Sequence, residues 1–176
     1  FFVAHLQNTV GNRLSGKYKS TIAGMENQSL LGIDTSYIDF ERKTQPLASP
    51  GSVNAFAPVS GSFGGSPSTF RLNPTKIFTV AAFFENILSV TEKLKLVVGM
   101  RQDHIDLSRQ KINDPTAGGS FDRNFNPFSW RVGAVYELAP SMNIYAQMSS
   151  GADPLGSDIF LVNSNQNFDL AKSQQW

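Results

Sequence analysis

The sequence predicts an all-β protein, an antiparallel up-and-down β-barrel that crosses a membrane. Three features support this: apolar and polar residues alternate with period two, the connections between these segments are short and long in turn, and the segments run to about 10 to 15 residues, longer than ordinary strands. No apolar run reaches the roughly 18 residues of a transmembrane helix. We therefore expect strands to make the membrane crossings.

The alternation is clearest in FSWRVGAVYEL, residues 128–138. Its even-numbered residues form one apolar face, while its odd-numbered residues, which include Arg131 and Glu137, form the other. Residues 142–150 repeat this pattern, and residues 76–90 follow it except where Asn86 falls on the apolar face. In a membrane barrel the apolar face contacts lipid and the polar face lines the lumen.

The connections alternate in length along the whole chain. Short turns are predicted at residues 25–28, 91–93 and 139–141, and long Pro-, Gly-, Ser- and Asn-rich loops at about 43–75, 108–127 and 153–167. Residues 8–15 are predicted to form a shorter outer loop. Long structureless loops are uncommon in compact domains, but a membrane barrel carries tight turns at its periplasmic rim and long loops outside.

The stretch VVGMRQDHIDL, residues 97–107, assigns the faces of one strand. When Val98 and Met100 face lipid, Arg101 and Asp103 face the lumen. A one-residue shift would move Arg101 into lipid, at a cost of roughly 2 to 4 kcal/mol near the midplane. Aromatic residues should collect at the membrane interfaces. The candidates for such belts are Tyr37, Phe40, Phe78, Phe128 and Trp130 at loop ends and Tyr136 at a turn end.

Several kinds of site are excluded or disfavoured. The chain has no Cys, so it holds no disulfide or thiolate site, and its formal net charge of +1 gives no general attraction to nucleic acid. GNRLSGKY, residues 11–18, has Tyr18 where a phosphate-binding loop needs Ser or Thr, and is expected to be a loop that enters a strand. His5 and His104 are too few for a metal site. We expect no catalytic residues, no bound metal, no intrinsic cofactor and no nucleic-acid partner.

Four stretches together resemble the barrel of TonB-dependent outer-membrane receptors, most closely the ferric-siderophore branch. They are LLGIDTSYIDFER (30–42), FFENILSVTEKLKLVVGMRQDHIDLS (83–108), FSWRVGAVYELAPSMNIYAQMSSGADP (128–154) and FDLAKSQQW (168–176). The matching positions are Gly32, Asp34, Gly99, Arg101, Asp103, Ser129, Arg131, Gly133, Tyr136, Pro140, Tyr145, Ser149, Gly151 and Pro154. These motifs are weak singly and specific in combination.

The resemblance implies that residues 1–176 are part of a larger receptor. The family's barrel has about 22 strands around a plug, and this chain would supply about seven or eight of them, without the plug domain and the C-terminal strands. The chain opens on FFVAHLQ with no initiator Met, so we expect it to be an internal piece of a longer protein.

The resemblance also implies a location and partners. The receptor would sit in the outer membrane of a Gram-negative bacterium, surrounded by lipid and lipopolysaccharide. It would take up a ferric siderophore as its transported ligand, driven by the TonB complex acting through the absent plug. No covalent bond would be made or broken, so the chain would not be an enzyme.

Two sets of candidate site residues follow from the resemblance. The first set lies in or beside the long outer loops and would contact the ligand, or would simply pack loop against loop: Phe56, Phe63, Phe70 and Arg71. The second set would line the lumen wall and face the plug: Asp34, Arg101, Asp103, Arg131 and Tyr145.

Other functions remain as alternatives. One is a different outer-membrane barrel, either a porin or a TonB-dependent receptor for haem, cobalamin or a glycan. Another is a soluble β-sandwich that binds carbohydrate with its apolar face turned inward, although the strand lengths argue against it.

Overall fold

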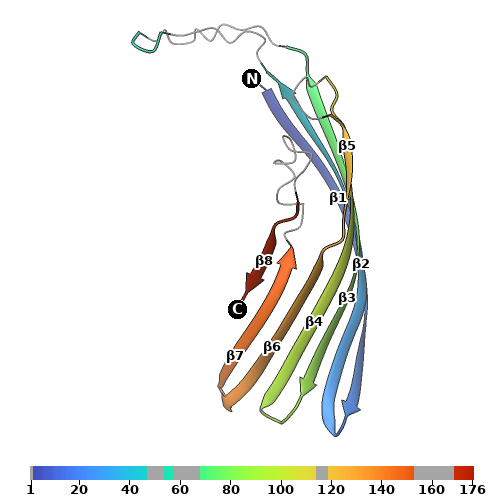
Figure 1. Cartoon of the computed structure of the whole chain (residues 1–176), viewed down its shortest axis with the longest axis vertical. Coiled ribbons are helices and arrows are strands. Elements are labelled where there is room, and N and C mark those ends of the chain that lie inside the picture. Colours follow the sequence, from blue (N-terminus) through green and yellow to red (C-terminus); the bar gives the residue numbers. More distant parts are fainter. Residues whose placement is uncertain (1, 47–53, 58–67, 114–118, 153–168) are drawn as a thin grey trace.

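The computed structural model describes residues 2–46, 54–57, 68–113, 119–152 and 169–176, which form one antiparallel sheet of eight strands (Figure 1). The strands are β1 (Phe2–Ile22), β2 (Met25–Gln45), β3 (Arg71–Ser89), β4 (Leu94–Arg109), β5 (Phe121–Phe125), β6 (Phe128–Ala139), β7 (Met142–Ala152) and β8 (Lys172–Gln175). Their order is β1-β2-β3-β4-β6-β7-β8, and β5 pairs with β4. The predicted all-β, antiparallel, up-and-down fold is confirmed. The described residues contain no helix long and apolar enough to cross a membrane.

Three tight turns lie at the same end of the sheet (Figure 1). Between β1 and β2, Ala23 and Gly24 have positive φ angles of 51° and 81°, the backbone of a two-residue hairpin turn. Between β3 and β4, the Thr91 hydroxyl accepts hydrogen bonds from the backbone N–H of Lys93 and of Leu94. The three predicted short turns are thus present, although the first comes earlier than residues 25–28. The long loop predicted at residues 153–167 lies outside the described residues.

The first strand corrects the prediction of a loop at residues 8–15. β1 is continuous for 21 residues, and its register with β2 runs unbroken from Phe2 opposite Gln45 to Ile22 opposite Met25. The polar residues and glycines that suggested a loop here lie inside a strand whose partner is regular throughout. GNRLSGKY is therefore strand interior, not a loop entering a strand.

The second correction concerns the loop predicted at residues 108–127. β4 continues to Arg109, and β5 lies within the predicted loop and pairs with the loop-side end of β4. β6 pairs with the turn-side part of β4, up to Gln102 opposite Phe128. The Pro127 carbonyl accepts a hydrogen bond of 3.1 Å from the backbone N–H of Asp103, so the pairing of β4 passes from β6 to β5.

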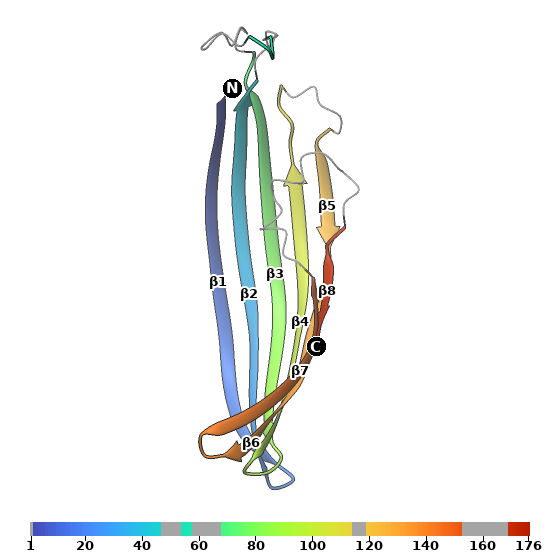
Figure 2. The same ribbon diagram turned by 90° about the vertical axis from the view of Figure 1, so that its left-hand side faces the viewer.

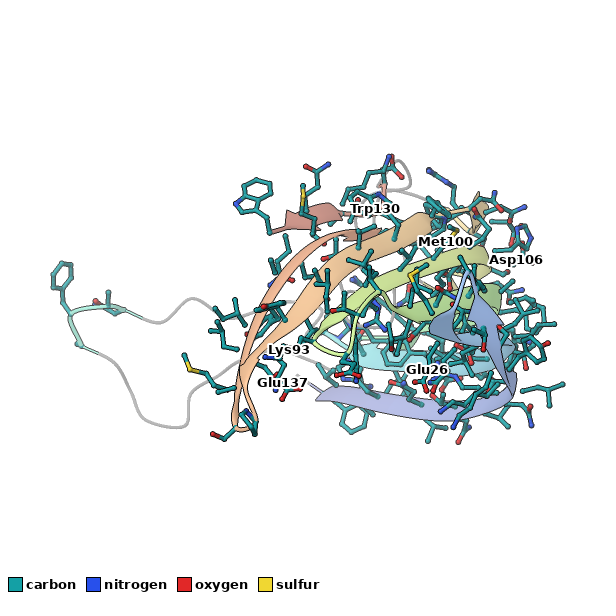
Figure 3. The ribbon with its side chains drawn as sticks, turned by 90° about the horizontal axis from the view of Figure 1, so that it is seen from below. Glu26, Lys93, Met100, Asp106, Trp130 and Glu137 are labelled. Atoms are coloured by element: carbon teal, nitrogen blue, oxygen red, sulfur yellow. The ribbon has the colours of Figure 1, made fainter. Side chains whose placement is uncertain are left out.

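The sheet has two chemically distinct faces. We call the face that carries Arg101 the inner face and the face that carries Met100 the outer face. Cross-strand neighbours share a face, and Met100 lies opposite both Phe84 and Trp130 on the outer face (Figure 3). Leu31 and Val132 on the same face are also exposed. The predicted register of residues 97–107 is confirmed.

The strands are longer than one membrane crossing requires. β1 and β2 each have 21 residues and β3 has 19 (Figure 2). At about 3.3 Å per residue, 21 residues span roughly 70 Å, whereas a crossing needs about 9 to 11 residues. These three strands therefore have enough length to extend well beyond a bilayer.

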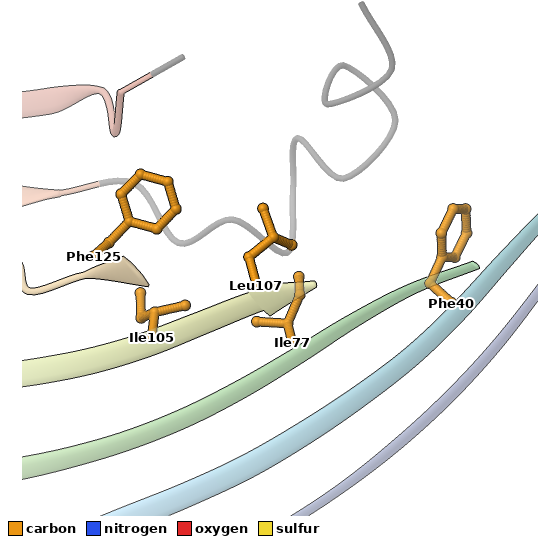
Figure 4. Packing of buried hydrophobic residues seen from close by; sticks show 5 residues of the cluster. All are labelled: Phe40, Ile77, Ile105, Leu107 and Phe125. Carbon is orange, nitrogen blue, oxygen red and sulfur yellow. The ribbon is translucent and has the colours of Figure 1, made fainter. Parts of the chain in front are cut away.

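The polarity of the two faces reverses toward the loop end. There the inner face becomes apolar and buries a cluster of Phe40, Ile77, Ile105, Leu107 and Phe125, drawn from β2, β3, β4 and β5 (Figure 4). The outer face at this level carries charged residues. Phe40 is 2% exposed and belongs to this cluster, so its predicted place in an aromatic belt is wrong. Tyr37, Phe78, Phe128 and Trp130 remain exposed on the outer face.

Candidate functional site

A chain of four charged side chains crosses the middle of the inner face. Arg13 on β1 donates from Nη2 to Asp34 Oδ2 on β2 at 2.7 Å. Arg101 on β4 donates from Nη1 to the same Asp34 oxygen at 2.5 Å and from Nη2 to Asp103 Oδ1 at 2.8 Å. Between Asp34 and Asp103 in this row lies Ala81 of β3, whose small side chain leaves room for Arg101 to reach over β3. Positive and negative charges therefore alternate across four strands.

A second ion pair crosses β4 toward the turn end. Arg131 of β6 donates from Nη2 to Glu85 Oε2 of β3 at 2.7 Å. Its side chain passes directly over Gly99 of β4, where an added Cβ would lie 2.9 Å from Arg131 Cγ. The absence of a side chain at Gly99 is what allows β6 and β3 to be joined across the strand between them.

Phe83 links the two pairs on the same face. Its ring covers Gly32 of β2, and the Arg13 guanidinium lies 5.1 Å from the ring centroid, a cation–π distance. Arg13, Phe83, Glu85, Arg101 and Arg131 line a groove of about 420 Å³ that extends from β1 to β7. Its charged side chains are held in place by the ion pairs described above.

The polar groups of this groove are suited to hydrogen bonding. Its polar lining groups are guanidinium, carboxylate, hydroxyl and amide side chains, including Ser129, Ser149 and Gln147, and they lie beside apolar residues such as Phe83. No group of three or more His, Cys, Asp or Glu residues in the described ranges is placed to hold a metal ion. Such a surface can accept and donate hydrogen bonds to another polar surface or to a solute.

The predicted lumen-wall residues all lie on the inner face. Asp34, Arg101 and Asp103 are joined directly, and Arg131 lies on the neighbouring strand with its own partner. Tyr145 of β7 also faces inward, opposite Val135, but it is 79% exposed and lies nearer the turns than these four residues. That these residues face a plug stays a prediction.

Sequence reasoning missed two members of the network. Arg13 was assigned to the loop at residues 8–15 and so had no register, although an unbroken β1 places it opposite Asp34. Glu85 falls on the polar face of the alternating residues 76–90, but this pattern gives it no partner. The signal that could have paired it is Gly99, directly opposite it on β4, with Arg131 opposite Gly99 on β6.

The predicted loop contacts fall in different environments. Phe56 is 99% exposed, and its backbone N–H is bound by the Asn54 side chain at 2.9 Å. Phe63 lies outside the described residues. Phe70 packs edge-on against Phe2 at 6.0 Å, which favours the interpretation that it packs loop against strand.

Arg71 begins β3 on the inner face, opposite Thr44. It therefore belongs to the sheet wall rather than to a loop.

The sheet resembles part of two solved receptors. It matches the siderophore receptor PiuA from Acinetobacter baumannii with a TM-score of 0.74 at 13% identity, over 98% of this chain and 28% of that one. It matches the open form of the ferric-catecholate import receptor Fiu from E. coli K12 with a TM-score of 0.66 at 15% identity, over 85% of this chain and 26% of that one. The chain thus spans about a quarter of the length of these receptors.

No curated protein sequence matches the chain. A family model does: the one described as TonB dependent receptor-like, beta-barrel, matches residues 3–176, nearly the whole chain. The antiparallel sheet, with its apolar outer face and its ion-paired inner face, has the architecture that such a barrel wall requires. The chain therefore belongs to the TonB-dependent receptor β-barrel family.

Proposed function

We propose that this chain is part of a Gram-negative outer-membrane receptor that takes up a ferric siderophore with energy from the TonB complex. The observation that carries the proposal is the family match over residues 3–176. Two solved structures with the same fold, PiuA and Fiu, are described as siderophore and ferric-catecholate receptors, which supports this choice of ligand. The receptor acts as a transporter and catalyses no reaction.

The two faces acquire roles in this proposal. The outer face near the turns contacts lipid, the turns lie in the periplasm, and the long connections lie outside the cell, where lipopolysaccharide surrounds the barrel. The inner-face network of Arg13, Asp34, Arg101 and Asp103, with Arg131 beside it, lines the lumen. It offers hydrogen-bonding groups to a plug that fills the barrel.

Because the chain belongs to the TonB-dependent receptor β-barrel family, we no longer propose a porin or a soluble β-sandwich. A different ligand, such as haem, cobalamin or a glycan, is the alternative that the experiment has to separate. The complete receptor should be purified and tested for binding to a panel of ferric chelates of different chemistry, and to haem, cobalamin and oligosaccharides.

Uptake is measured in parallel. A strain that lacks the receptor should lose iron-restricted growth on one ferric chelate, and plasmid-borne receptor should restore it only when TonB is present. If uptake of no ferric chelate depends on the receptor, the proposed ligand class is wrong.

A further inference from the structure

A cluster of polar side chains interrupts the apolar outer face near the turns. We call it the amide cluster, and it consists of Ser20 on β1, Asn27 and Ser29 on β2, and Asn86 on β3. The register places all four on the outer face. Apolar residues lie on both sides of the cluster along the strands: Ile22, Met25, Leu31, Phe84 and Leu88. In the proposed orientation this face meets lipid, where polar side chains are costly and mark functional sites.

Hydrogen bonds inside the amide cluster use both side-chain N–H groups of each asparagine. Asn27 donates from Nδ2 to Ser20 Oγ at 3.1 Å and to Ser29 Oγ at 3.3 Å. Asn86 donates from Nδ2 to Asn27 Oδ1 at 2.8 Å and to Ser29 Oγ at 2.9 Å. Asn27, which is 6% exposed, is therefore the buried centre that holds the other three side chains in place.

The three partly exposed members of the amide cluster keep unused hydrogen-bonding groups. Asn86 Oδ1 accepts no hydrogen bond from any residue that the structure describes, and the hydroxyls of Ser20 and Ser29 act there only as acceptors. An amide oxygen can accept two hydrogen bonds, and each serine hydroxyl can still donate one. A ligand that fits must therefore donate to Asn86 and accept from the serines.

The depth of the amide cluster matches the headgroup region of the leaflet next to the turns. The outer face becomes charged at Asp39 and Lys76, directly beyond Tyr37 and Phe78, which indicates the border of the membrane on the loop side. Tyr37 and Asn27 are ten residues apart on β2, about 33 Å along the strand. At a strand tilt of about 40° this distance covers roughly 25 Å of membrane, the height of the apolar band of a barrel.

The surroundings of the amide cluster narrow the kind of headgroup. Tyr18, opposite Ser29, is 69% exposed, as expected of an aromatic residue at a membrane interface. The turn-side strand residues that the structure describes in β1, β2, β3 and β4 include no charged residue on the outer face. The lysines of this region lie on the inner face: Lys17, Lys19 and Lys95. Anionic lipids are recognised by lysine and arginine, so this site fits a headgroup without net charge.

We propose that the amide cluster binds a phospholipid headgroup with a primary ammonium and a phosphate, the chemistry of phosphatidylethanolamine. This inference rests on the proposed outer-membrane location. The ammonium donates to Asn86 Oδ1, and the phosphate oxygens accept from the hydroxyls of Ser20 and Ser29. Phosphatidylcholine carries the same charges but has no N–H group, so it cannot make the first of these bonds.

The test titrates the complete receptor in detergent with phosphatidylethanolamine, phosphatidylcholine or phosphatidylglycerol of identical acyl chains, and native mass spectrometry counts the bound lipids. Asn86→Leu removes the free acceptor. Ser29→Ala removes a hydroxyl and leaves Asn27 bonded to Ser20. Asn12→Leu is the matched control, because it makes the same change at an exposed outer-face residue of β1 nearer the loops. Circular dichroism verifies that each variant folds.

The unmodified receptor should bind phosphatidylethanolamine about fivefold to tenfold more tightly than phosphatidylcholine, because one hydrogen bond from a charged donor distinguishes them. Phosphatidylglycerol should bind more weakly than phosphatidylethanolamine. Asn86→Leu should bind the ethanolamine and choline lipids equally, whereas Ser29→Ala should bind both more weakly and keep the preference. Asn12→Leu should keep both affinities within about twofold.

Three results would overturn the inference. They are equal binding of the ethanolamine and choline lipids by the unmodified receptor, a preference that Asn86→Leu leaves unchanged, and tighter binding of phosphatidylglycerol. If Asn86→Leu does not fold, the lipid comparison with the unmodified receptor and with Ser29→Ala still decides. All of these leave uptake of a ferric siderophore in place. Cell fractionation that finds the receptor outside the outer membrane would instead overturn the proposed function.

Discussion

Arg101 is the residue whose removal tests the inner-face network most directly. Its guanidinium donates to Asp103 three times, at 2.8, 3.0 and 3.1 Å, and once to Asp34. Arg101→Met keeps most of the side-chain volume and removes every one of these bonds. Asp103, which is 9% exposed, then loses the cation with which it is paired.

The magnitude follows from burial and geometry. A hydrogen bond to a charged group contributes about 1.5 to 3 kcal/mol, and the one-third exposure of Arg101 places it at the lower end because water screens the charges. The buried Asp103 carboxylate adds about 1 kcal/mol when its hydrogen bonds are lost. We therefore expect Arg101→Met to lower the free energy of unfolding by about 2 to 3 kcal/mol.

The assay is urea unfolding of the complete receptor in phospholipid vesicles, arranged as a double-mutant cycle with Asp103→Asn. The double variant should lose at least about 1 kcal/mol less than the two single losses added together. Lys76→Met, which removes an exposed cation from the outer face at the loop-side end of β3, is the control and should change stability by less than about 0.5 kcal/mol. A change just as small for Arg101→Met, or additive losses in the cycle, would refute a stabilising role for the network.

Two further predictions test the course of the wall through the membrane and the packing over β4. Leu31→Arg, on the outer face of β2 near the turns, should cost about 2 to 4 kcal/mol of unfolding free energy in vesicles. Glu41→Arg, on the outer face at the loop-side end of the same strand, should be nearly neutral, and equal costs would contradict the proposed membrane boundary. Gly99→Ala should cost about 1 to 3 kcal/mol of unfolding free energy because the new Cβ would lie 2.9 Å from Arg131 Cγ. Gly16→Ala is the control and should not destabilise the receptor, because the space around its Cβ is open. Similar losses in both variants would show that the change in strand propensity, and not the contact with Arg131, sets the cost.

Most of the architecture could be predicted because it depends on local patterns. Alternation with period two assigned the faces of β4, β6 and β7 correctly, since successive side chains of any strand point to opposite sides. The same rule applied along β2 would have placed Phe40 on the inner face with Asp34. Its position near the end of a strand suggests a membrane interface instead, and the prediction that Phe40 lies in an aromatic belt is wrong.

The errors arose where local composition is ambiguous. Asn, Arg, Ser and Gly at residues 8–15 suit a loop as well as a strand, and only the unbroken pairing with β2 decides between them. β5 is only five residues long, too short to be recognised from alternation. It forms because the end of β4 extends past β6 and leaves backbone N–H and C=O groups with which β5 can pair.

The all-β class, the three tight turns and the face on which each charge of residues 97–107 lies follow from the sequence alone. Which charges meet depends on how the strands are assembled. Arg101 reaches Asp34, 67 residues away in the chain, by crossing β3 at Ala81, and Arg131 reaches Glu85 over Gly99. Such pairs depend on the register of three strands at once and on a small residue in the strand between. The alternation of residues along a single strand gives no information on either the register or the residue that the side chain crosses.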